Sequence, residues 1–121
     1  MVVKISLAPP NSLILIVGAE KYEVPSSMKG AAIAQTLSCI AVGSLSEIDG
    51  QTSIVLKKIG DSEPQFAPSF SGFIDTPSCL IEVKTVLGKT LLQMPVQDTK
   101  TKIVIWTNDR FEPDEIIIGI E

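Results

Sequence analysis

The chain has 121 residues, a length typical of one domain of about 100 to 150 residues, and we expect a single domain over residues 1–121. Hydrophobic residues make up 45% of the sequence and charged residues only 20%, with a formal net charge of −4, so the chain can fill a core and still leave apolar surface for a partner. Histidine is absent, which excludes Ser-His-Asp and Cys-His catalytic sites.

Other common functional classes also lack support in the sequence. We find no Walker-type phosphate loop and no GxGxxG pattern after a strand, so no nucleotide cofactor is expected. The apolar run at residues 13–18 is shorter than the roughly 20 residues that a membrane span requires. The N-terminus shows no succession of basic, apolar and small residues, so we expect a cytoplasmic protein with no membrane association.

The first 36 residues predict two or three strands and one short helix. Residues 2–7 alternate as a strand that Pro9 and Pro10 end, and residues 13–17 form an apolar run typical of a strand covered on both faces. Residues 22–24 are expected to resume a strand before Pro25. Residues 27–36 predict a short helix, because a serine precedes an alanine-rich stretch.

Residues 37–59 predict a β-hairpin around the dipeptide Asp49-Gly50. Asp followed by Gly tolerates the positive φ angles of a two-residue type I′ turn. Pairing outward from this turn places Leu45 opposite Ile54 and Gly43 opposite Leu56. The face expected to point to the core carries Cys39, Ala41, Gly43, Leu45, Ile54 and Leu56.

The second half of the chain predicts further strands. One short strand is expected near residues 66–73, and residues 79–86 and 89–96 predict a second hairpin around Leu87-Gly88. Residues 102–108 and 115–120 are strongly β-prone. Seven to nine short strands at roughly ten-residue intervals indicate an all-β, antiparallel β-sandwich of Greek-key type.

Several residues of types that often occur in active or metal sites are expected to have only structural roles here. Cys39 and Cys79 are expected to be small buried residues and not a disulfide or a zinc site. Trp106 alternates with Val104, which indicates core packing. Asp75 and Glu82 have no spacing that supports a general acid and base pair, so we do not expect an enzyme.

The first candidate surface is the acidic segment 109–115. Its residues expected to bind a partner are Asp109, Phe111, Glu112, Asp114 and Glu115. A concentrated negative loop at the tip of a sandwich attracts a basic partner and repels nucleic acid. Two alternatives stay open: a solvated turn whose charges discourage edge-to-edge aggregation, and a Ca²⁺ site made by Asp109, Glu112 and Asp114.

The second candidate surface is the proline-rich segment 63–77. It contains three of the four phenylalanines, Phe66, Phe70 and Phe73, and an exposed aromatic side chain on a stiff loop would anchor a partner. The alternative is that this segment folds back and caps an open end of the core.

These features favour a non-catalytic protein-binding module. Its most concrete form is an acidic inhibitor or immunity-type protein that binds a basic protein or an enzyme such as a nuclease. One alternative is a homo-oligomeric assembly subunit that adds strands through residues 115–120. Another is a Ca²⁺-binding β-sandwich module.

Overall fold

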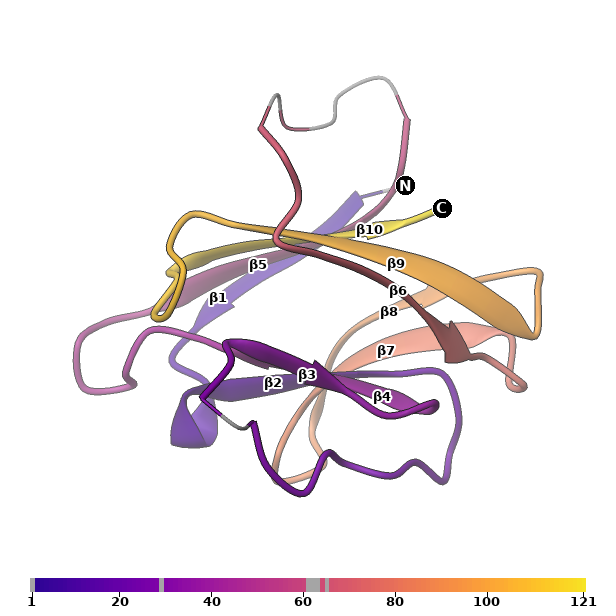
Figure 1. Ribbon diagram of the computed structural model, residues 1–121, viewed down its shortest axis with the longest axis horizontal. Helices are drawn as coiled ribbons and strands as arrows, with labels where there is room; N and C mark the ends of the chain where they lie inside the picture. The colour runs from indigo at the N-terminus through magenta and orange to yellow at the C-terminus, as the bar shows by residue number, and fades with distance from the viewer. Residues whose placement is uncertain (1, 29, 61–63, 65) are drawn as a thin grey trace.

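The computed structural model describes residues 2–28, 30–60, 64 and 66–121, and within them it shows two five-stranded sheets packed face to face (Figure 1). The all-β prediction is confirmed, although the strands number ten and not seven to nine. The strands are β1 (Val2–Leu7), β2 (Leu13–Val17), β3 (Ile33–Gln35), β4 (Cys39–Gly43), β5 (Thr52–Lys58), β6 (Phe70–Asp75), β7 (Leu80–Thr85), β8 (Thr90–Pro95), β9 (Lys100–Thr107) and β10 (Glu115–Ile120). A 3-10 turn at Pro10–Ser12 separates β1 from β2.

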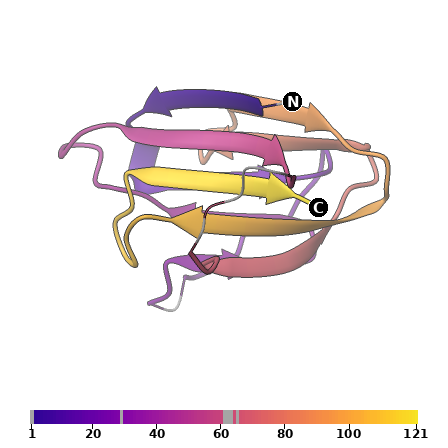
Figure 2. The same ribbon diagram turned by 90° about the horizontal axis from the view of Figure 1, so that it is seen from above.

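Sheet A has the order β1-β5-β10-β9-β6, and sheet B has the order β3-β4-β2-β7-β8. Figure 2 shows the five strands of sheet A from above in this order. The prediction of a purely antiparallel sandwich is wrong at one place, because β10 pairs with β5 in parallel. β10 lies between β5 and β9 and pairs antiparallel with β9, so it is an interior strand. Residues 115–120 therefore offer no free edge, which contradicts the predicted strand addition through them.

The predicted hairpin at residues 37–59 is wrong. β4 pairs with β2 and β3 in sheet B, whereas β5 pairs with β1 and β10 in sheet A. Residues 44–51 therefore cross from one sheet to the other. Gly50 does have a positive φ of 140°, but it follows a turn at residues 47–49, and the segment joins strands that are not paired. Tertiary packing outweighed the local turn preference because β4 is buried on both faces and needs a neighbour on each edge.

The face of β4 that points to the core was also predicted incorrectly. Ile40 and Val42 belong to the core between the sheets, while Cys39 and Ala41 belong to a separate cluster on the outer face of sheet B. Ile54 and Leu56 of β5 lie in the main core, as expected. Fully buried isoleucines and other aliphatic residues dominate that core: Ile14, Ile16, Ile40, Val42, Ile54, Leu56, Ile74, Ile81, Val83, Ile103, Ile105, Ile116 and Ile118.

The outer face of sheet B is covered by residues 19–28 and 30–32. Tyr22 and Met28 pack there against Leu15 and Cys39. The strand predicted at 22–24 and the helix predicted at 27–36 are both wrong: the first segment is irregular, and residues 33–35 form β3. Covering this sheet requires a chain that bends, and Gly30 supplies a φ of 75° that a helix does not accept.

The two cysteines differ from the prediction that both are buried. Both are free thiols, with Cys39 buried and Cys79 exposed. Burial raises the pKa of the Cys39 thiol to about 11, so it remains protonated and unreactive at neutral pH.

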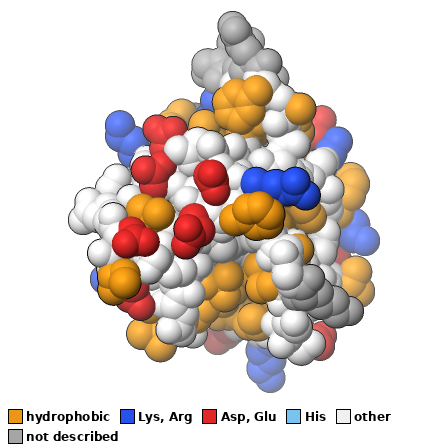
Figure 3. Space-filling view, turned by 60° about the vertical axis from the view of Figure 1, so that its left-hand side comes forward, with side chains coloured by type: hydrophobic (Ala, Val, Ile, Leu, Met, Phe, Trp, Pro, Cys, Tyr) orange, Lys and Arg blue, Asp and Glu red, His pale blue; other side chains and the backbone are white. Residues whose placement is uncertain are grey.

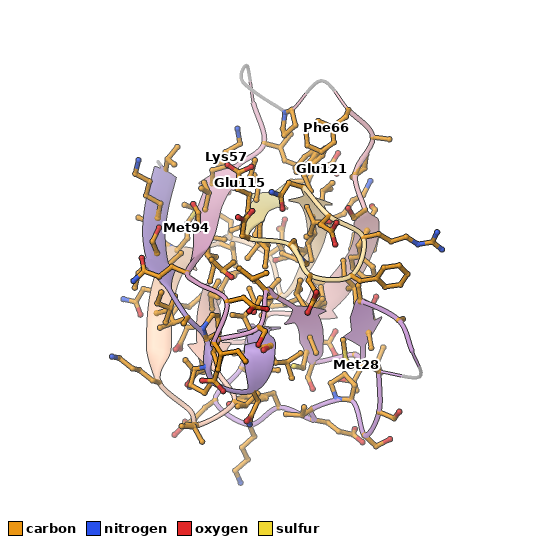
Figure 4. The ribbon with its side chains drawn as sticks, turned by 90° about the vertical axis from the view of Figure 1, so that its left-hand side faces the viewer. Met28, Lys57, Phe66, Met94, Glu115 and Glu121 are labelled. Atoms are coloured by element: carbon orange, nitrogen blue, oxygen red, sulfur yellow. The ribbon has the colours of Figure 1, made fainter. Side chains whose placement is uncertain are left out.

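The outer face of sheet A holds Trp106, which is only 5% exposed. Its indole Nε1 donates a hydrogen bond to the carbonyl oxygen of Phe66 at 3.1 Å. Ile103 and Ile105 on the same strand point into the core between the sheets, so Trp106 lies on the opposite face. Trp106 is buried, but the prediction that it packs in the core between the sheets is wrong. Figure 4 shows Phe66 above sheet A and Met28 at the opposite side of the molecule, under sheet B.

The second predicted hairpin is confirmed. β7 and β8 pair antiparallel, and Gly88 in the connecting turn has a φ of 88°. The part of the chain that the structure describes contains no helix with the length and hydropathy of a membrane span.

Candidate protein interface

Two loops meet at one end of the sandwich. Residues 108–114 connect β9 to β10, and residues 44–51 connect β4 to β5. The backbone N–H of Leu45 donates to the carbonyl oxygen of Pro113 at 2.8 Å, and the N–H of Ser53 donates to that of Asp114 at 2.7 Å. The two loops therefore form one continuous surface, although more than 50 residues separate them in the sequence.

This surface carries six carboxylates on exposed residues, and we call it the acidic end. Figure 3 shows acidic side chains gathered on this face of the molecule. Its members are Glu47, Asp49, Asp109, Glu112, Asp114 and Glu115. The first two come from the β4–β5 connection and the others from the β9–β10 connection or the start of β10.

Asn108 holds the base of the β9–β10 loop closed. Its side-chain Oδ1 accepts hydrogen bonds from the backbone N–H groups of Asp114 and Glu115, each at 3.1 Å. Its Nδ2 donates to Oδ1 of Asp114 at 2.6 Å. A single amide thus joins the two ends of the loop, and this is a common role for asparagine because it can accept and donate at once.

Asp109 folds the first half of the same loop. Its Oδ2 accepts hydrogen bonds from the backbone N–H groups of Glu112 at 2.8 Å and Phe111 at 2.9 Å. These two bonds, that from Glu112 first, hold the pKa of the Asp109 carboxyl below its ordinary value. Asp109 is therefore ionised at neutral pH, and it acts mainly on the conformation of the loop.

Apolar side chains stand beside the carboxylates. Phe111 is 63% exposed, and the guanidinium of Arg110 lies 5.3 Å from the centre of its ring. Ile48 in the neighbouring loop is 89% exposed. An exposed aromatic ring on a hydrogen-bonded loop is a typical anchor in a protein interface, and surrounding charges select the partner.

The carboxylates of the acidic end are not neutralised within the described part of the chain. Ion pairs among those residues join Glu82 to Lys84, Asp75 to Lys100 and Glu121 to Lys102. None of the three involves the acidic end. Among the described residues, the carboxylates of the acidic end therefore have no ion-pair partner.

The structure brings together five of the eight residues predicted to bind a partner, because Asp109, Phe111, Glu112, Asp114 and Glu115 share one end of the sandwich. Their binding role stays a prediction. Glu47, Ile48 and Asp49 were missed, because the sequence placed them in a hairpin turn. The signal that could have found them is Ile48 between two acidic residues, because exposing a large apolar side chain in a turn is unfavourable unless another protein covers it.

The three phenylalanines of segment 63–77 do not form one surface. Phe66 is 55% exposed over the outer face of sheet A, and Phe73 is 53% exposed on β6. Phe70 is partly buried and packs against the main core, so it supports the alternative in which this segment caps the core. Residues 61–63 and 65 lie outside the described residues.

The acidic end does not assemble a metal centre in the described structure. Within residues 2–28, 30–60, 64 and 66–121, no group of three or more His, Cys, Asp or Glu side chains could hold a metal ion. Oxygen atoms of Asp109 and Asp114 already accept hydrogen bonds within the loop. The proposed Ca²⁺ site of Asp109, Glu112 and Asp114 therefore gains no support from the geometry.

The fold resembles that of two solved structures. ComJ from Bacillus subtilis, an inhibitor of the DNA-degrading activity of NucA, matches with a TM-score of 0.72 and 10% sequence identity, over 99% of this chain and 97% of ComJ. The protein of crocagin biosynthetic gene J matches with a TM-score of 0.60 and 13% identity, over 99% of this chain and 96% of that protein. The sequence matches no family model and no curated protein.

Proposed function

We propose that this chain is a non-catalytic protein that binds a basic partner through its acidic end. The most concrete version is inhibition of a basic enzyme such as a nuclease. The observation that carries the proposal is the acidic end itself, where main-chain hydrogen bonds join two distant loops and their carboxylates have no ion-pair partner among the described residues.

Concentrating like charges on one surface costs free energy. Carboxylates on adjacent loops repel one another, so their accumulation without ion-pair partners among the described residues does not stabilise the fold. The same field accelerates encounter with a positively charged surface and makes binding depend on ionic strength. In a nuclease, a positive surface serves to bind phosphates, and carboxylates held on a preorganised loop can occupy that surface instead.

The structural similarity supports this proposal. ComJ inhibits the DNA-degrading activity of NucA, and its fold covers nearly the whole of this chain. At 10% identity the similarity extends to the fold, and the inhibitory role is our inference for this protein.

The test compares two charge-reversed variants that change the net charge equally. Glu47→Lys, Glu112→Lys and Glu115→Lys together reverse the acidic end without touching the carboxylates that fold its loop. The control combines Glu20→Lys, Glu23→Lys and Asp98→Lys, which are exposed residues outside the two loops. Each immobilised protein captures partners from a lysate of the source organism, mass spectrometry identifies them, and the activity of each purified partner is assayed with and without the unmodified chain.

We expect the unmodified chain and the control variant to capture the same basic enzyme and to inhibit it. The acidic-end variant should lose both capture and inhibition. Equal recovery by the two variants would contradict the proposed role of the acidic end, and capture without inhibition would leave a binding protein that is not an inhibitor.

A further inference from the structure

The edges of the two sheets come together at β3 and β6, on the side of the sandwich nearest the viewer in Figure 1. β3 ends the order of sheet B, and β6 ends the order of sheet A. The backbone N–H of Asp75 donates to the carbonyl oxygen of Leu37 at 2.8 Å, and the side-chain Nε2 of Gln35 donates to the carbonyl oxygen of Phe73 at 2.8 Å. These bonds close one half of the seam between the sheets.

The other half of the seam is open. Beyond Gln35, towards the β9–β10 loop, a cleft of about 560 Å³ separates the two edges. Its walls are residues 30–33 before and in β3, Ser69 and Phe70 at the start of β6, and residues 107–111. This volume lies within the range of about 300 to 1,000 Å³ that is common for binding clefts. Asp109 of the acidic end is among the residues of these walls, so the cleft and the acidic end are continuous, and the cation Arg110 lies between Asp109 and Phe111 in the same wall.

Unpaired backbone groups flank this cleft. Because the N–H of Asp75 and the C=O of Phe73 both point away from β9, the alternation of a strand turns the backbone groups of Ser71 in the same direction. On the facing edge, Ala32 accepts a hydrogen bond from Gly43 of β4, so the groups of Ile33 point away from β4. The N–H and C=O of Ser71 therefore point outward from the edge of sheet A, next to Phe70 in the cleft wall, and those of Ile33 point outward from the edge of sheet B.

These two edges lack the lysine and proline that commonly protect an edge strand, and the protection of β3 is its length of only three residues. Natural edge strands commonly carry lysine or proline, which discourage another chain from adding to the sheet. The edge strand β1 contains Lys4, and the edge strand β8 contains Pro95. Neither β3 nor β6 contains a lysine, an arginine or a proline.

We propose that the cleft between β3 and β6 receives an extended segment of the basic partner, which pairs with the free edge at Ser71 and inserts apolar side chains between the sheets. The inference rests on the proposed function, because the acidic end recruits the partner whose segment enters the cleft. Ala31, Ile33 and Phe70 supply apolar contacts along the cleft, while Phe111 stands beside its mouth. Main-chain pairing supplies affinity in this mode, and alternate side chains supply specificity.

Gln35 has a defined place in this proposal. Its amide makes the hydrogen bond to Phe73 that a longer incoming strand would make with its own backbone. Gln35 is exposed and is hydrogen-bonded through Nε2 alone in the described structure, to Phe73 and Thr36. Removing it extends the free edge of β6 by one pairing position, so Gln35→Ala should strengthen the binding of an extended segment.

The experiment uses peptides in place of the unidentified partner. A phage-displayed library of random ten-residue peptides is selected on the full chain, and enriched sequences are synthesised for affinity measurements. Ala31→Trp fills the cleft from an exposed position, and Ser71→Pro removes the outward N–H, which an edge strand tolerates. Leu87→Trp adds the same ring at an exposed turn outside the cleft and serves as the control. Thermal melting checks that each variant is folded.

We expect enriched peptides with alternating apolar residues and at least one Lys or Arg. Their affinity should fall at least tenfold with Ala31→Trp and with Ser71→Pro, rise severalfold with Gln35→Ala and stay within twofold with Leu87→Trp. Hydrogen exchange should show protection of the Ser71 amide in the complex.

The inference is overturned if no peptide is enriched, if the selected peptides bind Ala31→Trp as well as the unmodified chain, or if Ser71→Pro has no effect. The last result would indicate an apolar ligand pocket without strand pairing. Failure of the proposed function is distinguishable, because it is read from capture of a whole partner by the acidic-end variant and not from peptide binding.

Discussion

The two ends of the sandwich differ in whether their carboxylates form ion pairs. At the acidic end, six carboxylates are exposed and none makes an ion pair within the described residues. At the other end, Nζ of Lys100 lies 4.0 Å from a carboxylate oxygen of Asp75, and that of Lys102 lies 3.1 Å from one of Glu121. Carboxylates at that end are therefore paired with lysines of the same sheet, while those of the acidic end have no such partner among the described residues.

Buried threonines show the same contrast. Thr76, near the neutralised end, donates to the carbonyl oxygen of Asp98 and shares a 2.8 Å hydrogen bond with Thr101. Thr52, at the acidic end of β5, is fully buried, and among the described residues its Oγ1 is the buried side-chain oxygen without a hydrogen-bond partner. The hydroxyl of Thr76 is therefore satisfied, whereas the unpartnered hydroxyl of Thr52 carries a cost in stability.

The largest expected effect comes from neutralising the acidic end. Glu47→Gln, Glu112→Gln and Glu115→Gln together should weaken partner binding about 100-fold, on the basis of roughly 1 kcal/mol for each lost charge pair. Stability should rise by a few tenths of a kcal/mol, because repulsion between exposed charges is weak. Calorimetric titration and urea unfolding measure the two quantities.

The matched change at the other end is Glu121→Gln. It removes the ion pair with Lys102 and should lower stability by about 0.2 to 1 kcal/mol without changing partner affinity. If Glu121→Gln weakened partner binding as much as the triple variant of the acidic end, the difference in ion pairing between the two ends would have no role in binding.

The next effect concerns the asparagine that closes the β9–β10 loop. Asn108→Ala removes three hydrogen bonds and should lower the free energy of unfolding by about 1 to 3 kcal/mol. Partner affinity should fall at least tenfold, because the loop is no longer preorganised. Asn108→Asp keeps the oxygen that accepts the two backbone N–H groups but replaces the donor to Asp114 by a carboxylate oxygen, so it should recover only part of the stability. Loss of stability with unchanged affinity would show that the loop does not contact the partner.

The two buried threonines should respond to the same substitution with opposite signs. Thr52→Val replaces a hydroxyl that has no partner and should stabilise the protein by about 1 kcal/mol. Thr76→Val breaks a satisfied network and should destabilise it by about 1 to 2 kcal/mol. Urea unfolding of both variants measures the difference, and a destabilised Thr52→Val would show that its hydroxyl has a partner.

The smallest effect is a pH dependence localised to Asp109. Its pKa is depressed in the folded state from the ordinary value of 3.8, so its stabilising contribution is present above that value and is lost as the pH falls through the lower, folded-state pKa. Asp109→Asn should therefore flatten the acid limb of the stability curve below about pH 4. Asp98→Asn, for which no carboxylate hydrogen bond exists in the described structure, serves as the control. An unchanged acid limb in Asp109→Asn would contradict the role of its two hydrogen bonds.

The sequence predicted local features better than long-range ones. Residues 13–17 and 115–120 were recognised as strands because continuous β-branched and aliphatic runs favour extended backbone. The β7–β8 hairpin was recognised because its two strands are adjacent in the chain and join through Gly88. The helix over 27–36 failed because alanine propensity is a weak preference, and covering the outer face of sheet B outweighed it.

The sequence predicted the part of the candidate site that is contiguous in the chain and missed the part that only the fold brings to it. Four of the seven residues in 109–115 are acidic and lie close together in the sequence, so composition alone identified them. Glu47 and Asp49 joined them only because residues 44–51 cross between the sheets and bond to Pro113.

By itself, the sequence determined that this protein is built from short strands, lacks a histidine-based catalytic site and concentrates negative charge near its C-terminus. The tertiary structure decided which strands are neighbours, that β10 is interior, and that two loops share one acidic end. The physical reason is that backbone hydrogen bonds between strands are the same for every sequence. The partner of each strand is therefore chosen by how side chains from both sheets fill the common core, and a reading of adjacent residues does not contain that information.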